Sequence, residues 1–250
     1  MKRSLFAALF AFAVAAAACD DKSAADAKPQ PDAPPKVTAS ARAAAPPAAD
    51  TLPSLNVDEA AATLAGMRID FSGDARGKLT AALEGSPKVR GSMMPVEAMR
   101  NATMPRVSTA LAALKAAGAR GAVLRTATRE RSVIGELVVE FDAAAPAPCS
   151  VVAMVGKDSA ITVWAAGGGS AQRFAHGMAG PDLTLGSEGM RKASASCDSQ
   201  VYFLGADDAV KWGLVFDLAL AARAFEAGAM RATQARVLLS APSPARKLRE

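Results

Sequence analysis

The chain has one histidine, three cysteines and only 5% aromatic residues. Transition-metal sites usually combine several His and Cys ligands, so the lone His176 excludes a histidine-based metal cluster within one chain. A Gly-x-Ser-x-Gly elbow and a glycine-rich phosphate loop followed by Lys-Ser/Thr are also missing. Apolar residues are plentiful, since 51% of the 250 residues are hydrophobic, which excludes a chain disordered throughout.

The N-terminal apolar run is too short to span a bilayer. It extends from Leu5 to Ala18, whereas a spanning helix needs about 20 residues. Lys2 and Arg3 precede it and small residues follow it, which is the pattern of a secretory leader. We therefore predict a signal peptide over residues 1–18, with an uncleaved anchor as the alternative.

Cys19 ends this leader, and the run Ala16-Ala17-Ala18-Cys19 resembles a bacterial lipobox, in which the cysteine is lipidated. The departure is Ala16, where that motif usually has leucine. The lipobox predicts lipidation at Cys19 and anchoring to a membrane on the periplasmic side of the bacterial cell envelope. Asp20 resembles an inner-membrane retention signal, which favours the inner membrane. Ordinary cleavage beside an accidental cysteine is the alternative.

The net charge of +5 does not indicate a nucleic-acid partner. Without Lys2 and Arg3, 27 of the 29 basic residues remain against 24 acidic ones, so the excess falls to +3. No stretch combines clustered basic residues with aromatic ones. Residues 19–54 are rich in Ala and Pro and cannot build a core, so we interpret them as a tether, or as a low-complexity spacer.

Two α+β units are expected after the tether, over residues 55–142 and 143–250. We predict a two-layer α+β fold in which helices pack on one face of a mixed sheet. Both units contain a helix, an Ala-Gly-Ala joint and an apolar strand, so two related repeats are considered beside chance likeness. The expected helices are 57–64, 74–83, 105–118, 187–193 and 214–228, and the expected strands are 67–71, 87–94, 122–124, 133–141, 151–155, 161–164, 201–204 and 237–239.

Cys149 and Cys197 remain once Cys19 is assigned to the leader. Two cysteines are an even number, as an oxidising compartment favours. Each lies just before a predicted strand, at Val151 and Val201, so the sulfurs meet if those strands are neighbours. We predict a structural disulfide. Free buried thiols and a redox pair are the alternatives, although the sequence has no Cys-x-x-Cys motif.

The second unit resembles the periplasmic domain of ExbD/TolR-type biopolymer-transport proteins. The resemblance rests on the turn at Lys157-Asp158, the segment from Val201 to Gly213, the helix from Leu214 and the strand at Val237-Leu238-Leu239. It covers about residues 151–240, and fainter over 56–142. It implies two helices on one face of a mixed sheet, dimerisation, and contact with cell-wall or transducer elements. The family's motor also depends on a membrane helix carrying an aspartate, and the leader has no acidic residue in its apolar run.

The resemblance therefore implies the fold without proton coupling. The function expected is a membrane-tethered envelope lipoprotein with a non-catalytic binding or assembly role, accessory to biopolymer transport. We expect no cofactor, no metal and no nucleic-acid partner. The partners that fit this assignment are the membrane, through the lipid anchor, and envelope transport proteins, peptidoglycan or a second copy of the chain. A structural lipoprotein without a small ligand is another alternative.

An envelope hydrolase is the alternative of a different class, with its site in the loop 167–182. Ser170, His176 and Asp182 lie near one another there, but an exposed loop histidine explains the same pattern. The run Gly167 to Ser170 can present backbone amides to an anion or form a flexible loop. Asp207-Asp208 can hold a cation or form a turn. Trp164, Tyr202 and Trp212 are predicted to be core residues.

Overall fold

The computed structural model describes residues 52–129, 133–141, 146–177, 180–223 and 232–248. These residues form four helices and a single eleven-stranded mixed sheet, so the α+β class is confirmed. In chain order the elements are β1 (Leu55–Val57), β2 (Ala61–Leu64), β3 (Met67–Asp70), α1 (Ala75–Glu84), β4 (Met93–Ala98), α2 (Met104–Ala116), β5 (Gly121–Ala127), β6 (Ile134–Glu140), β7 (Val151–Val155), β8 (Ile161–Ala165), β9 (Gln172–Phe174), α3 (Leu183–Ser194), β10 (Val201–Ala206), α4 (Trp212–Arg223) and β11 (Gln234–Val237).

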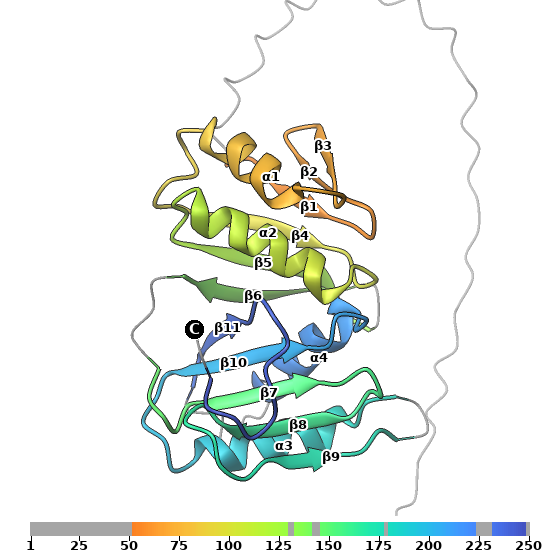
Figure 1. The fold of residues 1–250 in the computed structure, drawn as a ribbon, viewed down its shortest axis with the longest axis vertical. Coiled ribbons are helices and arrows are strands. Elements are labelled where there is room, and N and C mark those ends of the chain that lie inside the picture. The colour runs from red at the N-terminus through yellow and green to blue at the C-terminus, as the bar shows by residue number, and fades with distance from the viewer. Residues whose placement is uncertain (1–51, 130–132, 142–145, 178–179, 224–231, 249–250) are drawn as a thin grey trace, which may run out of the picture. The chain divides into compact units, whose positions relative to one another are not determined.

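The strands follow the order β3-β2-β1-β4-β5-β6-β11-β10-β7-β8-β9 across the sheet (Figure 1). We call the part from β1 to β5 the first half and the part from β7 to β11 the second half, with β6 between them. Each half begins with antiparallel strands and continues with parallel ones: β1 is antiparallel to β2 and parallel to β4, and β7 is antiparallel to β8 and parallel to β10. Among the described residues, no helix has the length and apolarity that crossing a membrane requires.

The predicted helix over 57–64 is wrong, because this segment is the hairpin of β1 and β2. The Asp58 side chain accepts the amide hydrogens of Ala60 and Ala61, at 2.6 and 2.7 Å, and this Asx turn reverses the chain. Val57 then pairs with Ala98 of β4. Neighbouring strands therefore override the helical propensity of an alanine-rich run.

Most other predicted elements are present with shifted ends. The helices at 74–83, 105–118 and 187–193 correspond to α1, α2 and α3, and Asp74 caps α1 as the N-cap. The strand predicted at 87–94 lies later, as β4 from Met93, and the last strand lies earlier, as β11. The predicted helix from Leu214 to Gly228 is α4 as far as Arg223; residues 224–231 lie outside the described residues.

The helices occupy different sides of the sheet in the view of Figure 1. There α1 and α2 lie in front of their strands, whereas α3 and α4 lie behind β7, β8 and β10. Yet α2 and α4 both contact β5. The prediction that all helices pack on one face of the sheet is not confirmed by this arrangement.

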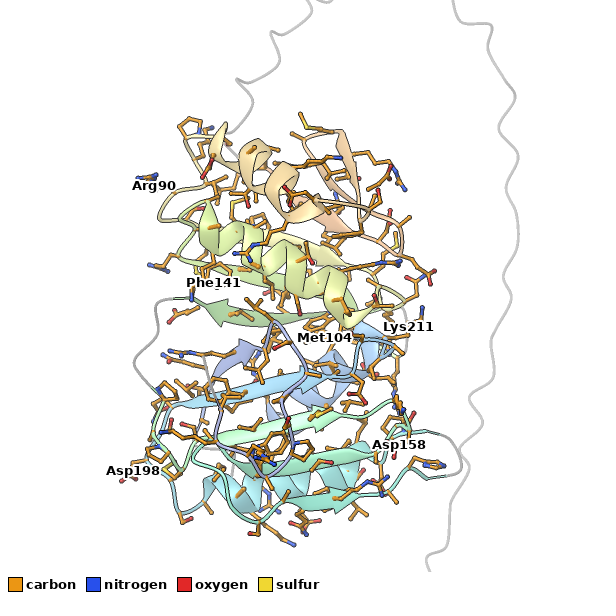
Figure 2. The ribbon with its side chains drawn as sticks, viewed as in Figure 1. Arg90, Met104, Phe141, Asp158, Asp198 and Lys211 are labelled. Atoms are coloured by element: carbon orange, nitrogen blue, oxygen red, sulfur yellow. A yellow bond between two sulfur atoms is a disulfide. The ribbon has the colours of Figure 1, made fainter. Side chains whose placement is uncertain are left out.

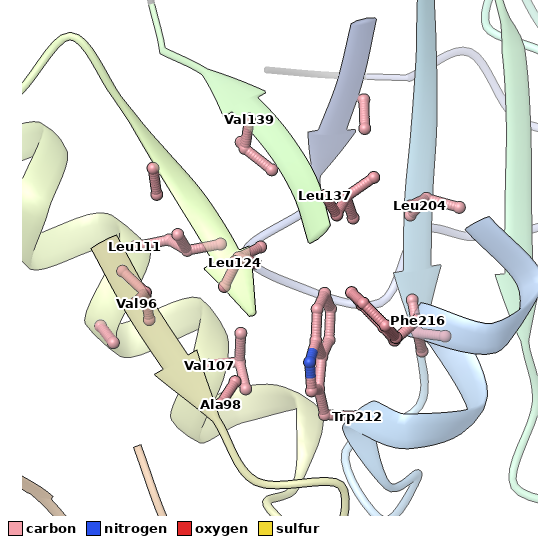
Figure 3. Close-up of a cluster of buried hydrophobic side chains, with 14 of the residues drawn as sticks. Val96, Ala98, Val107, Leu111, Leu124, Leu137, Val139, Leu204, Trp212 and Phe216 are labelled. Carbon is pink, nitrogen blue, oxygen red and sulfur yellow. The ribbon is translucent and has the colours of Figure 1, made fainter. Parts of the chain in front are cut away.

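One hydrophobic cluster extends through both halves. Figure 3 shows its middle, where Val107 and Leu124 of the first half lie near Trp212, Phe216 and Leu204 of the second. Trp212, Tyr202 and Trp164 are at most 2% exposed, which confirms their prediction as core residues. A smaller cluster lies on the opposite face of the second half and consists of Val152, Met154, Trp164, Ala166, Val201 and Phe203.

Candidate functional site

The parallel pairing of β7 with β10 brings two cysteines together. Val151 pairs with Tyr202, so the residues that precede both strands meet at one edge of the sheet. The Cα atoms of Cys149 and Cys197 are 5.6 Å apart and their sulfurs are positioned as a disulfide. Cys197 is 2% exposed. The structure thus confirms a cysteine pair compatible with the predicted disulfide. Cys19 lies outside the described residues.

The glycines of the loop 167–182 use their amides within the chain. The amide of Gly167 donates to the Pro148 carbonyl, that of Gly168 to Ala165, and that of Gly169 to Ala245, at 2.6 to 3.0 Å. These bonds hold the loop against the strands and the C-terminal segment. The amides are therefore already paired, as a folded loop requires, instead of facing an anion.

No hydrogen bond among the described residues links Ser170, His176 and Asp182 as a catalytic group would be linked. Ser170 and His176 are exposed, and Asp182 is the N-cap of α3, where its carboxylate accepts the amide of Leu185 at 3.0 Å. The loop also contains the strand β9, which the sequence analysis did not predict. Within the described part of the chain, no group of three or more His, Cys, Asp or Glu residues is arranged to hold a metal ion.

The Asp207-Asp208 pair forms a turn. The Asp207 carboxylate accepts the amide of Lys157 at 2.7 Å, which links the β7–β8 hairpin to the end of β10. The Asp207 carbonyl accepts the amide of Val210, and Asp208 is exposed. The turn interpretation therefore fits the observed bonds.

A buried carboxylate on α4, which was not predicted from the sequence, joins the two halves. Asp217 has a side chain that is 5% exposed, and Arg100 binds both of its oxygens, at 2.8 and 2.6 Å. Arg129 adds a third contact at 3.0 Å. The bond to Asp217 raises the pKa of Arg100, because removing its proton would leave the carboxylate without its partner. Asp217 stands between Phe216 and Leu218, so an acidic residue inside an apolar helix was the available signal.

The loops before α2 and α4 lie against each other beside this ion pair. Thr103 and Lys211 form an antiparallel bridge, and Figure 2 shows Met104 and Lys211 close together. Next to the bridge, the indole N–H of Trp212 donates to the Thr126 hydroxyl at 2.8 Å, and that hydroxyl donates to the Ala98 carbonyl at 3.0 Å. We call the region of Arg100, Thr103, Thr126, Lys211, Trp212 and Asp217 the junction.

A shallow hollow lies where α1 and α2 begin. It has a volume of about 290 Å³ and includes Arg76, Arg106 and Thr109 among its lining residues. The same lining contains Asp74, whose carboxylate accepts the amide of Gly77 at 2.9 Å. The two guanidinium groups and the hydroxyl can receive a polar group, but no residue here has the geometry of a nucleophile and its base.

No family model, curated protein or solved structure matched this chain in the comparisons with known proteins. The residues and contacts of the chain itself are therefore the basis for assigning a function.

Proposed function

We propose that this chain is a bacterial envelope lipoprotein with an ExbD/TolR-like fold. In this proposal a lipid on Cys19 and the tether 19–54 hold the folded part on the periplasmic side of a membrane. The folded part has a binding or assembly role without catalysis. The cysteine pair Cys149–Cys197 carries the proposal, because disulfides persist in oxidising compartments such as the periplasm and are rare in the cytosol.

The order of elements supports two related repeats within the chain. Each half consists of three strands, a helix, a strand, a helix and a strand. The strand order is β3-β2-β1-β4-β5 in the first half and β9-β8-β7-β10-β11 in the second, so each strand has a counterpart in the same place. The second half coincides with the segment 151–240 that resembles the ExbD/TolR domain, and each half has two helices and a mixed sheet as that domain does.

Hydrogen bonds at the junction repeat the same correspondence. The amide of Met104 donates to the Val210 carbonyl at 2.9 Å, and the amide of Trp212 donates to the Ala102 carbonyl at 2.7 Å. Met104 begins α2 and Trp212 begins α4, so the two bonds are reciprocal between counterparts. Two helices that resemble each other only by chance would not be expected to exchange hydrogen bonds between equivalent positions.

The hairpins at the start of each half also carry the same side-chain pair. Asp58 accepts the amide of Ala60 and binds Arg68 of β3. Asp158 accepts the amide of Ala160 and binds Arg173 of β9. A shared Asp–Arg pair in a shared position favours duplication of one unit.

The non-catalytic role is proposed because, among the described residues, no hydrogen bond joins the side chains suggested for a hydrolase. Ser170 and His176 are exposed and share no hydrogen bond among the described residues, and Asp182 is used as a helix cap. No contact in the described residues favours the hydrolase over a binding role.

Lipidation and partner binding are tested together in the bacterial envelope. We expect the full chain to incorporate labelled palmitate, Cys19→Ala to abolish the label, and globomycin to cause accumulation of the unprocessed chain. We also expect the lipidated chain to retain peptidoglycan fragments or envelope transport proteins in a pull-down. Equal labelling of the wild type and Cys19→Ala would reject the anchor, and hydrolysis of envelope material lost in His176→Ala would reject the non-catalytic role.

A further inference from the structure

The C-terminal segment covers one face of the second half. Leu238 and Leu248 pack against the smaller hydrophobic cluster, and the carbonyl of Arg246 accepts the indole N–H of Trp164 at 3.2 Å. The amide of Leu248 donates to the Ala166 carbonyl at 2.8 Å. Figure 1 shows this segment in front of β10, β7 and β8, on the side away from α3 and α4.

On the corresponding face of the first half, large apolar side chains remain exposed. Core residues of β4, β5 and β6, such as Val96, Leu124 and Leu137, point to the helix side. The alternate residues point to the other side, which we call the outer face. On this face Val138 is 43% exposed and Ile134 is 67% exposed. Large apolar side chains at this exposure are typical of contact surfaces when they are contiguous.

The strand register places apolar residues of the outer face in one row across three strands and in a separate pair, with the charged row of Glu97, Arg125 and Glu136 between them. Pro95 pairs with Val123, and Val123 pairs with Val138, so one row crosses three strands. Ile134 pairs with Ala127 in a further row. Directly paired side chains lie about 5 Å apart, so the row is one continuous apolar stripe. Pro95 on β4 corresponds to Phe203 on β10, which the smaller cluster buries.

Charges beside the stripe are mainly acidic. Glu97, Glu136 and Glu140 lie at alternate positions of β4 and β6 that face outward, against Arg125 of β5 and Arg236 of the neighbouring strand β11. Arg125 binds Glu136 at 2.9 Å. Carboxylates therefore outnumber guanidinium groups on the outer face, and this negative charge complements a basic partner. The C-terminal segment that covers the second half is itself basic beside its leucine, with Arg246 and Lys247 before Leu248.

We propose that the outer face of β4, β5 and β6 is a docking surface for an extended basic segment of a protein partner, with apolar side chains spaced as in residues 238–248. The apolar side chains lie on the stripe of Pro95, Val123 and Val138. The basic side chains reach the carboxylates of Glu97 and Glu140. This inference deepens the binding role proposed above, but binding of such a segment in vitro does not depend on lipidation or localisation.

The test uses a fluorescent peptide with the sequence of residues 238–248 and the full chain purified in detergent. We expect fluorescence anisotropy to show micromolar binding that weakens as salt concentration rises, because part of the attraction is between charges. Val138→Lys and Glu140→Lys are each expected to weaken binding at least tenfold. The matched control is Leu185→Lys on α3, which is 47% exposed and lies away from the outer face, and it is expected to bind as the wild type does.

Three results would overturn the proposal. The first is the absence of binding up to millimolar peptide. The second is equal binding by the wild type and Val138→Lys, since the peptide would then occupy another surface, such as that of the chain's own C-terminal segment. The third is a wild-type dimer in light scattering that Val138→Lys separates, because a second copy would then be the occupant. If Cys19 is not lipidated but the peptide still binds, the envelope assignment is rejected and the docking surface stands.

Discussion

At the scale of single residues, the junction depends on one carboxylate. Asp217 is buried and binds guanidinium groups that come from two separate parts of the chain, Arg100 after β4 and Arg129 after β5. Burying these charges removes them from water, and the attraction repays that cost only while both partners are present. The pair is therefore weak evidence for net stability and strong evidence for a fixed geometry.

We predict that Asp217→Ala lowers the free energy of unfolding by about 3 kcal/mol, because it leaves Arg100 partly buried beside no counter-charge. Glu136→Gln is the control, since it breaks the exposed pair with Arg125 and should cost less than about 1 kcal/mol. Urea denaturation followed by circular dichroism measures both. Equal small losses in the two variants would contradict a structural role for the buried pair.

Tyr202 supplies a second residue-scale prediction, at alkaline pH. Burial raises the pKa of Tyr202 from 10.0 to about 12, and its hydroxyl has no hydrogen-bond partner among the described residues. The folded state therefore holds its proton at a pH where the unfolded state has lost it, so stability should fall as pH rises from about 10 towards 12. Tyr202 is the only tyrosine, so absorbance of tyrosinate near 295 nm reports this group alone.

The matched variant is Tyr202→Phe. It should keep the stability of the wild type at pH 7, within about 1 kcal/mol, because the lost hydroxyl has no hydrogen bond to any residue that the structure describes. Its stability should also fall less steeply above pH 10 in denaturant titrations. A tyrosine titration at pH 10 in the folded wild type would show that the hydroxyl is hydrated.

At the scale of elements, the stability of the β1–β2 and β7–β8 hairpins depends on pH through one aspartate in each hairpin. Hydrogen bonds from the backbone amides of Ala60 and Ala61 lower the pKa of Asp58, and the amide of Ala160, followed by Arg173, lowers the pKa of Asp158. Each carboxylate therefore stabilises the folded state above the ordinary aspartate pKa of 3.8. That contribution disappears as pH falls through the lower folded-state pKa.

We predict that Asp58→Asn combined with Asp158→Asn gives a flatter loss of stability between about pH 5 and pH 2. Thermal denaturation across this range measures the slope. Asp208→Asn, at an exposed turn position, is the control and should keep the slope of the wild type. An unchanged slope in the double variant would mean that other carboxylates dominate acid unfolding.

The link between the starts of β7 and β10 gives the next element-scale prediction. Cys149 and Cys197 are separated by 48 residues, so a disulfide between them should stabilise the fold by up to about 4 kcal/mol by restricting the unfolded chain. Cys149→Ser with Cys197→Ser should lose that stability, and a reductant should lower the stability of the wild type but leave the double variant unchanged. Two reactive thiols in protein purified without reductant would refute the bond.

The sequence predicts regular elements better than it predicts their partners. Pro105 and the spacing of Val107 and Leu111 predict α2, because helical periodicity is local. The helix prediction for 57–64 is wrong because an alanine-rich apolar run has no clear period. Whether this segment forms a helix or a strand depends on its pairing with β4. The short β9 has no apolar alternation to reveal it.

The candidate sites divide in the same way. The cysteine pair was predictable because two neighbouring strands begin just after the cysteines. The junction was not, because Arg100 and Asp217 are 117 positions apart and nothing local relates them. Only the unusual position of an acid within α4 was visible in the sequence.

At the scale of the whole molecule, the hydrophobic cluster is continuous across both halves. Val107 and Leu124 belong to the same cluster as Trp212 and Leu204. When one core extends across two halves, exposing one half removes contacts from the other, so partial unfolding is costly. The halves should therefore unfold together.

We predict a single cooperative transition. In Trp164→Phe the remaining Trp212 reports the junction, and in Trp212→Phe the remaining Trp164 reports the face under the C-terminal segment. In each variant, tryptophan fluorescence and far-UV circular dichroism should give the same urea midpoint. Different midpoints for the two probes would show that the halves unfold independently.

The strand β6 connects the first half to the second within one sheet, since it pairs with β5 on one side and with β11 on the other. The contact between the two loops of the junction is therefore formed within one chain and one sheet. An assembly of two separate subunits dissociates on dilution, whereas contacts within one chain do not depend on protein concentration. The protein would thus keep the bond between Met104 and Val210 even where few copies are present.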